Sequence, residues 1–291
     1  MEHKSEQWHT DIRIGSPFRW RKPRLADVNH STGDLFHEDV PEEFILDVFA
    51  VMAQAQKHTF QVFTKRPERM MQILSSPTIA NDVWVRTLQG VGAHDPQWPL
   101  PNVRLGTSVE DQVTADKRIP ELLKTLAAVR FLSVEPMLGT IDLSQYLFAA
   151  GSDGEPAPRN EPPLPCLHWV ICGGESGPGA RPIHPDWVRS LRDQSQVAGV
   201  PFRFEGWGEW VPCDSECGGP DRYSVRRPNY SAEQLAALPE MEKYANGRPY
   251  QLVNGPGGAK IMVRVGTKRA GRLLDGRMWD EMPVINTQAV S

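Results

Sequence analysis

Apolar and polar residues follow a repeated order between residues 25 and 207. A short apolar run comes first, polar residues end it, and a stretch follows in which apolar residues recur three or four positions apart. This order is typical of a buried strand that leads through a loop into an amphipathic helix. The apolar runs lie at residues 25–29, 59–63, 103–109, 129–134, 168–172 and 200–204.

The stretches between the runs carry signals for helix ends. Pro41, Pro67 and Pro185 each suit the first turn of a helix, and Gly199 suits the end of the last one. Strands that alternate with helices imply βαβ units and a parallel sheet. No G-x-G-x-x-G phosphate motif follows the first run, which weighs against a dinucleotide-binding sheet. We therefore predict an α/β fold: a partial TIM-type barrel of about six parallel strands with outer helices, plus a C-terminal irregular elaboration.

The rhythm breaks after Trp210, which sets the expected domain limits. Residues 18–212 form the predicted barrel, and two surface excursions interrupt it at 77–101 and 150–165. Residues 213–265 read as an insertion with a short helix near 231–244 and a hairpin at 250–265. Residues 266–283 are expected to form a terminal helix that packs on the barrel. A separate C-terminal module is the alternative.

Composition narrows the class of protein without naming a reaction. The 291 residues carry a formal charge of −4, which gives no overall attraction to nucleic acid or to anionic membranes but leaves room for a local basic groove. Four cysteines do not make a disulfide scaffold. The amino-terminal residues do not resemble a signal peptide, and no apolar stretch approaches a membrane span. These features predict a cytoplasmic protein with no membrane association.

Polar residues gather where the predicted strands end. Ligands of parallel α/β folds bind at the carboxyl ends of strands, so these residues are the candidate site. The alternative is that each one caps a helix or is simply solvated. The candidates are Asn29, Asp34, His37, Thr64, Lys65, Arg66, Ser108, Glu110, Ser133, Glu135, Glu175, Ser176, Arg181 and Glu205.

The glycine-rich segment 173–179 is the sharpest local signal. Its glycines, Gly173 and Gly174 first among them, permit close approach of the backbone to a ligand. Glu175 could receive an ammonium or hydroxyl group, and Arg181 could hold a carboxylate or phosphate in its fork. The alternative is a tight turn between strand and loop.

Other reactive side chains give weaker signals. Cys172 lies within an apolar run and is expected in the core, and the C-x₃-C spacing of Cys213 and Cys217 lacks the further ligands of a zinc site. Two histidines, at 30 and 37, flank Asp34, so a metal or acid–base role stays open. Trp207 and Trp210 are expected to close the barrel end, with a stacking platform for a base or an adenine ring as the alternative.

Several of these stretches together resemble a known family. They are Asp34-Leu35-Phe36-His37-Glu38-Asp39-Val40-Pro41, Thr64-Lys65-Arg66-Pro67-Glu68-Arg69-Met70, Ser133-Val134-Glu135-Pro136, the segment from Gly173 to Pro182, and Trp207-Gly208-Glu209-Trp210. In this order they resemble the phage-encoded three-cysteine-motif proteins, a family of unknown function with radical-SAM-like barrels. The resemblance covers residues 18–212 and 264–283. It implies a phage or prophage protein, S-adenosyl-L-methionine (SAM) as cofactor, and a four-iron cluster on three cysteines.

This chain departs from the family pattern in the cluster motif. No cysteine precedes Cys166, and the run at 25–29 matches the second strand of the family, so the iron-sulfur cluster expected for the family is not supported by this chain. A start codon placed downstream of the true one is the alternative explanation. Val134 stands where the family has cysteine, and Glu205-Gly206 stands where it has lysine-glutamine.

The leading hypothesis is a radical-SAM-like barrel that binds SAM or a nucleotide-like ligand at its strand ends. Its cofactor-binding residues would be Asn29, Lys65, Ser108, Ser133, Glu135, Gly173, Gly174, Glu175, Ser176 and Arg181. Its substrate-binding residues would be Asp34, His37, Arg66, Glu110, Glu205 and Trp207. Two other classes stay open. One is a module that binds nucleic acid through Lys65 and Arg66, or binds a partner protein. The other is a metal-dependent hydrolase built on Asp34, His37, Glu135 and Glu175.

Overall fold

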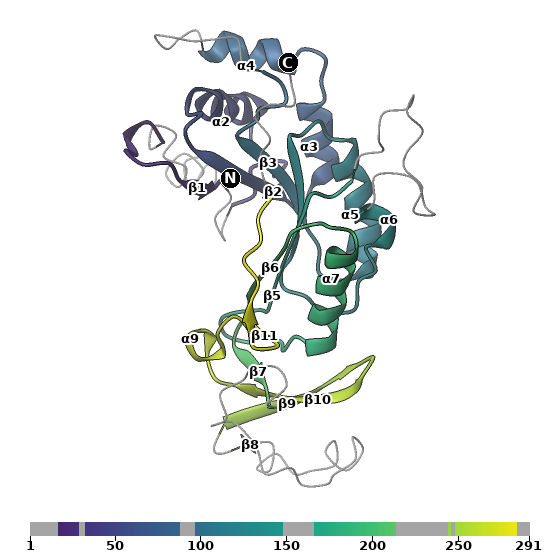
Figure 1. Ribbon diagram of the computed structural model, residues 1–291. Helices are drawn as coiled ribbons and strands as arrows, with labels where there is room; N and C mark the ends of the chain where they lie inside the picture. Colours follow the sequence, from purple (N-terminus) through teal and green to yellow (C-terminus); the bar gives the residue numbers. More distant parts are fainter. Residues whose placement is uncertain are drawn as a thin grey trace.

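The computed structural model describes residues 17–28, 33–87, 97–147, 166–213, 244–245 and 248–283. Its main feature is a six-stranded sheet with strands in the order β1-β2-β3-β4-β5-β6, and every neighbouring pair is parallel. The strands are β1 (Leu25–Asp27), β2 (Thr59–Thr64), β3 (Val103–Ser108), β4 (Val129–Val134), β5 (Trp169–Gly173) and β6 (Phe202–Gly206). The sheet curves into a half-barrel, so the predicted fold class is confirmed (Figure 1).

Helices follow the strands in the expected rhythm. A short 3₁₀ turn, η1, spans Pro17–Arg19. The helices are α2 (Glu42–Gln54), α3 (Pro67–Leu74), α4 (Ile79–Thr87), α5 (Gln112–Lys124), α6 (Ser144–Leu147) and α7 (Pro185–Val197). Pro67 and Pro185 occupy the first turns of their helices, as predicted. Asp111 begins α5 with a capping box, accepting a hydrogen bond from the Thr114 backbone N–H at 2.8 Å. Helix α4 lies inside the excursion at 77–101, where no helix was predicted.

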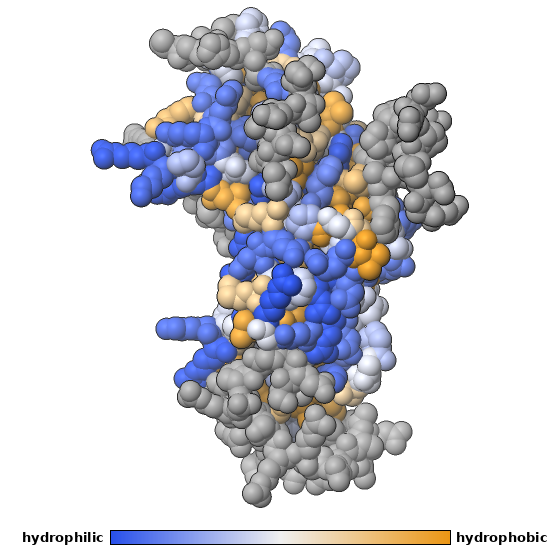
Figure 2. All heavy atoms as spheres, in the orientation of Figure 1, coloured by the Kyte–Doolittle hydropathy of each residue, from blue (hydrophilic) through white to orange (hydrophobic). Residues whose placement is uncertain are grey.

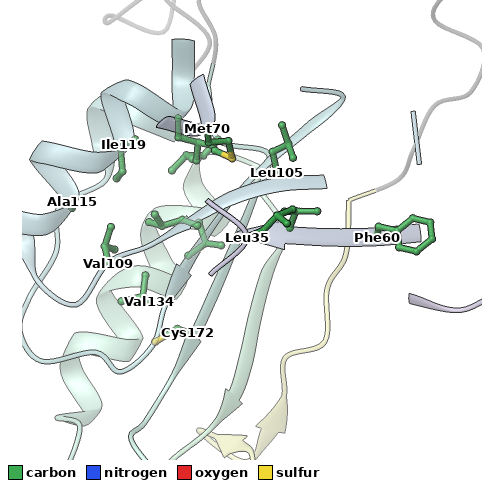
Figure 3. Close-up of a cluster of buried hydrophobic side chains, with 14 of the residues drawn as sticks. Leu35, Phe60, Met70, Leu105, Val109, Ala115, Ile119, Val134 and Cys172 are labelled. Carbon is green, nitrogen blue, oxygen red and sulfur yellow. The ribbon is translucent and has the colours of Figure 1, made fainter. Parts of the chain in front are cut away.

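The side chains of the half-barrel divide between two faces. The outward side chains of the strands join a large core with the helices, of which Figure 3 shows Leu105 and Val134 among helix residues such as Ile119. Cys172 lies in this core, fully buried, with its thiol 3.7 Å from the Met137 sulfur. Its assignment as a core residue is confirmed.

The inner face of the half-barrel carries a separate aromatic cluster. Phe131, Trp169 and Ile171 are buried there, and Phe63 packs against them. The ring of Phe131 lies over Gly106 on the neighbouring strand, where a Cβ atom would collide with it. Polar side chains lie on either side of this cluster along the strands, so the inner face is aromatic in the middle and polar toward both ends.

A second, antiparallel sheet lies below β5 and β6 in the view of Figure 1. Its strand order is β7-β10-β9-β8. The strands are β7 (Trp210–Pro212), β8 (Tyr244–Ala245), β9 (Arg248–Gly255) and β10 (Gly258–Arg264). Strands β9 and β10 form the predicted hairpin. The tip of the hairpin contacts the barrel, where the His184 ring nitrogen Nε2 lies 2.9 Å from the Gly258 carbonyl oxygen. The helix expected at 231–244 falls almost entirely outside the described residues.

The prediction of a terminal helix over 266–283 is wrong. The segment forms one helical turn, α9 (Thr267–Ala270), and then a two-stranded hairpin of β11 (Leu273–Leu274) and β12 (Arg277–Met278). Asp275 and Gly276 both have positive φ at the turn, at 53° and 73°. An Asp-Gly pair is a strong signal for this kind of tight turn, and here it outweighed the helical spacing.

Residues after β12 cover the exposed edge of β6. Asp280 forms an antiparallel bridge with Arg203, and the Phe204 N–H donates to the Trp279 carbonyl at 2.9 Å. In Figure 1 this yellow segment runs alongside the half-barrel. The segment pairs with backbone N–H and C=O groups of β6 that an edge strand would otherwise leave free to bind other chains.

Exposed large apolar side chains are scattered rather than gathered. They lie on different elements, for example Val85 on α4, Val113 on α5 and Val197 on α7. On the face shown in Figure 2, orange residues form small areas among blue ones. Within the described ranges, no helix is long and apolar enough to cross a membrane.

Candidate functional site

Asp34 ties the loop after β1 to the end of β2. Its carboxylate accepts hydrogen bonds from the Thr64 hydroxyl at 2.7 Å, from the Lys65 backbone N–H at 3.2 Å and from Arg66 Nη1 at 3.0 Å. It also accepts from the Phe36 N–H within its own loop. Asp34 and Arg66 therefore form an ion pair with each other. Both side chains stabilise the loops at the ends of β1 and β2.

We expect Asp34→Asn to lower the free energy of unfolding by about 2–3 kcal/mol, because the Arg66 ion pair and at least one accepted hydrogen bond are lost in a partly buried position. Urea unfolding with circular dichroism measures this change. Asp193→Asn on α7, where the side chain is 62% exposed and pairs with the adjacent Arg192, is the control and should change stability by less than about 0.5 kcal/mol. Equal effects of the two substitutions would contradict the assignment.

Lys65 and Glu110 form a second tie between strand ends. Lys65 Nζ lies 2.5 Å from Glu110 Oε1, and Arg118 Nη1 lies 2.9 Å from Glu110 Oε2. Arg118 also donates to the Ser108 carbonyl at 2.7 Å, at the end of β3. Since both Lys65 and Arg66 are paired with carboxylates, the structure does not favour the nucleic-acid groove built on these two cations.

Glu175 is neutralised by Arg181. The Arg181 fork donates to it through Nε at 2.8 Å and Nη2 at 3.1 Å, and the Arg181 backbone N–H donates at 2.8 Å. Hydrogen bonds from Arg181 lower the pKa of the Glu175 carboxyl. Glu175 and Arg181 were each predicted to bind a charged or polar group of a ligand, but they form an ion pair with each other. Both side chains lie toward the surface.

The glycine-rich segment packs closely against the backbone of residues 206–209, and this packing requires glycine. The Gly174 N–H donates to the Gly206 carbonyl at 2.9 Å, and the Glu209 N–H donates to the Glu175 carbonyl at 3.0 Å. A Cβ atom on Gly174 would collide with the Trp207 carbonyl, and one on Gly208 with the Glu175 carbonyl. The glycines therefore allow two backbone segments to pack closely at the ends of β5 and β6.

Trp207 belongs to the core. It is 1% exposed, its indole N–H donates to the Leu273 carbonyl at 2.8 Å, and its ring meets the Phe204 ring edge-on at 4.9 Å. The alternative of a stacking platform at Trp207 is therefore wrong, because its ring faces are covered. Its expected role in closing the barrel end agrees with this position. Trp210 is also buried and donates to the Ala180 carbonyl at 2.7 Å.

A different group of predicted residues meets on the inner face. Ser133 lies near the end of β4, Glu135 follows that strand, and the Ser133 hydroxyl donates to Glu135 Oε2 at 3.4 Å. Gly173, at the end of β5, leaves space for the Glu135 carboxyl, since a Cβ atom there would collide with it. Glu205 on β6 is paired with Arg203, whose Nε lies 2.6 Å from Glu205 Oε1.

This environment raises the pKa of Glu135 from 4.5 to about 7. Burial is the largest cause, because it penalises the carboxylate, and the negative charge of Glu205 acts in the same direction. The Ser133 hydrogen bond and the positive charge of Arg203 oppose the shift. Glu135 therefore gains and loses a proton close to neutral pH, which is a property of groups that perform acid–base chemistry or select charged ligands.

The remaining predicted residues take scattered positions. Ser108 is buried beside Ser133 in the register of β3 and β4. His37 lies 3.5 Å from Asp39, and Ser176 is exposed. Asn29 lies outside the described residues. A hollow of about 530 Å³ lies on the outer side between α6 and α7, and none of its lining residues was a predicted site residue.

Two inner-face arginines were missed. Arg203 was not proposed because it sits inside an apolar run, and Arg104 for the same reason. The sequence did contain a signal for both residues. Each is a charged residue within an otherwise apolar strand, at a position where the side chain points to the inner face. Residues alternate faces along a strand, so Arg104 shares the inner face with Gly106 and Ser108.

Comparison with known proteins identifies the family to which the chain belongs. The model of a family described as a protein of unknown function, DUF5131, matches residues 2–283. The chain belongs to this family. No curated protein matches it significantly. Among solved structures, ydhD of Bacillus subtilis, described as a sporulation-specific glycosylase, is 12% identical, with 86% of this chain and 82% of that chain covered and a TM-score of 0.23. A TM-score this low does not establish a shared fold, and nothing about this DUF5131 member follows from it.

The three described cysteines of this DUF5131 member lie in different parts of the fold. Among the described residues, no three His, Cys, Asp or Glu side chains are grouped to hold a metal ion. Cys166 precedes β5, Cys172 is buried in the helical core, and Cys213 follows β7. The set proposed for a metal-dependent hydrolase does not come together either, since Asp34 and Glu175 are held in separate clusters.

Proposed function

We propose that this half-barrel binds a small ligand with a positively charged group at the carboxyl ends of β4, β5 and β6, and that the ligand is SAM or a related nucleotide-like molecule. The observation that carries the proposal is Glu135, a carboxyl with a pKa of about 7 placed against Gly173 and beside Glu205 on the inner face. The motif resemblance to the three-cysteine-motif phage proteins, with their radical-SAM-like barrels, is what suggests SAM.

The inner face offers a matching set of groups. Glu135 supplies a carboxylate for an ammonium or sulfonium group, and the Ser133 hydroxyl can donate or accept a hydrogen bond. Glu205 is paired with Arg203 and adds negative charge nearby. Phe131 and Ile171 lie next along the strands and are only 1% and 6% exposed, so they form apolar packing beside these polar groups rather than a stacking surface for a ring. Glu175, expected from the sequence to receive the ammonium, is already paired with Arg181, so we assign this role to Glu135.

Binding should depend on the protonation of Glu135. Below its pKa the carboxyl is neutral and attracts a cation weakly, and above it the carboxylate supplies a charge-assisted hydrogen bond. SAM affinity should therefore rise as pH increases through about 7. S-Adenosylhomocysteine, which lacks the sulfonium charge, should show a smaller rise.

Isothermal titration calorimetry with SAM tests the proposal. We expect Glu135→Gln to weaken binding at pH 8 by roughly 10- to 100-fold, the loss expected for one charge-assisted hydrogen bond. Glu121→Gln on α5, which removes a carboxylate that pairs with Lys124 away from the proposed site, should bind as the wild type does. Absence of SAM binding by the wild-type protein at millimolar concentration, or unchanged binding by Glu135→Gln, would refute the proposal.

A further inference from the structure

Arg104 lies on β3, near the amino-terminal end of the inner face. Only 6% of the residue is exposed, and its guanidinium stands over the Trp169 ring, 5.1 Å from the ring centre. Register places it beside Gln61 on β2, which is equally buried. The aromatic side chains of Phe131 and Trp169 separate this end of the inner face from Ser133 and Glu135.

The guanidinium of Arg104 has few partners among the described residues. Its Nε and Nη1 atoms are buried and have no hydrogen-bond partner, and no carboxylate of the described ranges forms an ion pair with it. The one contact is from Nη2 to the Pro283 carbonyl, at a long 3.5 Å. Burial lowers the pKa of Arg104, as expected for a cation removed from water without a counterion.

Arg130, on the adjacent strand β4, shows how a largely buried arginine is normally hydrogen-bonded within a protein. It is also largely removed from solvent, but its Nε and Nη2 atoms both donate to the Thr125 carbonyl, at 3.1 and 2.8 Å. Buried charges in proteins are normally paired and hydrogen-bonded because an unpaired one is costly. Arg104 is a buried cation as well, but its Nε and Nη1 atoms lack an acceptor among the described residues.

We propose that Arg104 binds an oxyanion, the phosphate or carboxylate group of a small ligand, at the amino-terminal end of the inner face. The two buried and unpartnered donors, Nε and Nη1, would donate hydrogen bonds to the oxyanion oxygens. Trp169 supports the guanidinium plane from one side. Gln61, in register on β2, carries an amide that can donate a further hydrogen bond. This site does not depend on the Glu135 site or on SAM as ligand.

Inorganic phosphate tests the site directly. Equilibrium dialysis with radiolabelled phosphate should show saturable binding to one site in the wild-type protein. The thermal midpoint should rise with phosphate, relative to chloride at the same ionic strength and pH. Acetate and succinate, tested in the same way, show whether the site prefers carboxylates. A saturable effect of either class supports the site.

Two substitutions separate a ligand site from a structural arginine. Arg104→Met keeps the apolar stem and removes the charge, so phosphate binding should be lost. Without phosphate its midpoint should rise by about 2–4 °C, because an unpaired buried charge has been removed. Arg130→Met, the matched control, should keep phosphate binding and lower the midpoint, because it loses two hydrogen bonds to the protein.

Three results would overturn the proposal. The first is a wild-type protein in which neither phosphate nor a carboxylate acts differently from chloride. The second is phosphate binding by Arg104→Met equal to that of the wild type. The third is a fall in the phosphate-free midpoint of Arg104→Met as large as that of Arg130→Met, which would show that the protein itself supplies the partner. The first decides the matter even if Arg104→Met fails to fold.

Discussion

Gly208→Ala should lower the free energy of unfolding by about 2–5 kcal/mol, the sum of a left-handed backbone penalty and an overpacking penalty. Gly208 has φ of 69°, and a Cβ atom there would collide with the Glu175 carbonyl, which is backbone and has little freedom to move. The hydrogen bonds that join residues 174–175 to 206–209 would be strained by the same displacement. Chemical unfolding followed by circular dichroism measures the change.

Gly179→Ala is the matched control for this substitution. Gly179 has φ of 80° but nothing within 4 Å of the position of its Cβ atom. Alanine there should therefore cost only the backbone penalty, about 1–2 kcal/mol. If the two variants lose the same stability, the close approach of the two backbone segments is not what requires glycine at 208.

Glu135→Gln should make the protein more stable above pH 7 and leave it nearly unchanged at about pH 4. The folded protein raises the pKa of this carboxyl from 4.5 to about 7, so between these values the folded state holds the proton and the unfolded state releases it. The contribution of Glu135 is therefore fully present below about 4.5 and is lost as pH rises through about 7. A shift of this size corresponds to about 3 kcal/mol.

The difference between the two proteins isolates this group. Other residues also titrate: burial lowers the pKa of His168 and His184, which adds stability as pH rises. These contributions are common to wild type and variant and cancel in the difference at each pH. Urea unfolding at intervals from about pH 4 to about pH 8 should show the two stabilities diverging by up to about 3 kcal/mol. Stabilities that stay parallel would mean that Glu135 titrates like an exposed carboxyl.

Periodicity predicted the sheet because each strand is apolar over most of its length and each is followed by polar residues. Strand β4 was predicted at its observed limits, and the other inner strands were predicted to within about two residues. Periodicity did not predict the structure where two local signals competed. In the tail, the Asp275-Gly276 turn prevailed over helical spacing, and α4 formed within a segment whose prolines and tryptophan suggested a loop.

The candidate site was predicted as a ring, but its internal pairings were not. The residue types alone did not reveal that Arg181 neutralises Glu175 or that Asp34 holds Arg66, because these pairs depend on how loops fold back. They also gave no reason to prefer Glu135 over Glu175. That preference comes from burial beside Gly173 and from the nearby charge of Glu205, which only the folded arrangement supplies.

Carbon-13 NMR of the glutamate side-chain carboxyls tests the central claim most directly. The Glu135 resonance is assigned as the one absent from the Glu135→Gln spectrum, and its shift is followed from about pH 4 to about pH 9. The predicted result is a midpoint near 7, well above the ordinary glutamate value of 4.5. A Glu135 midpoint near 4.5 would contradict the account, because the carboxyl would then lack the environment on which the proposed binding site rests.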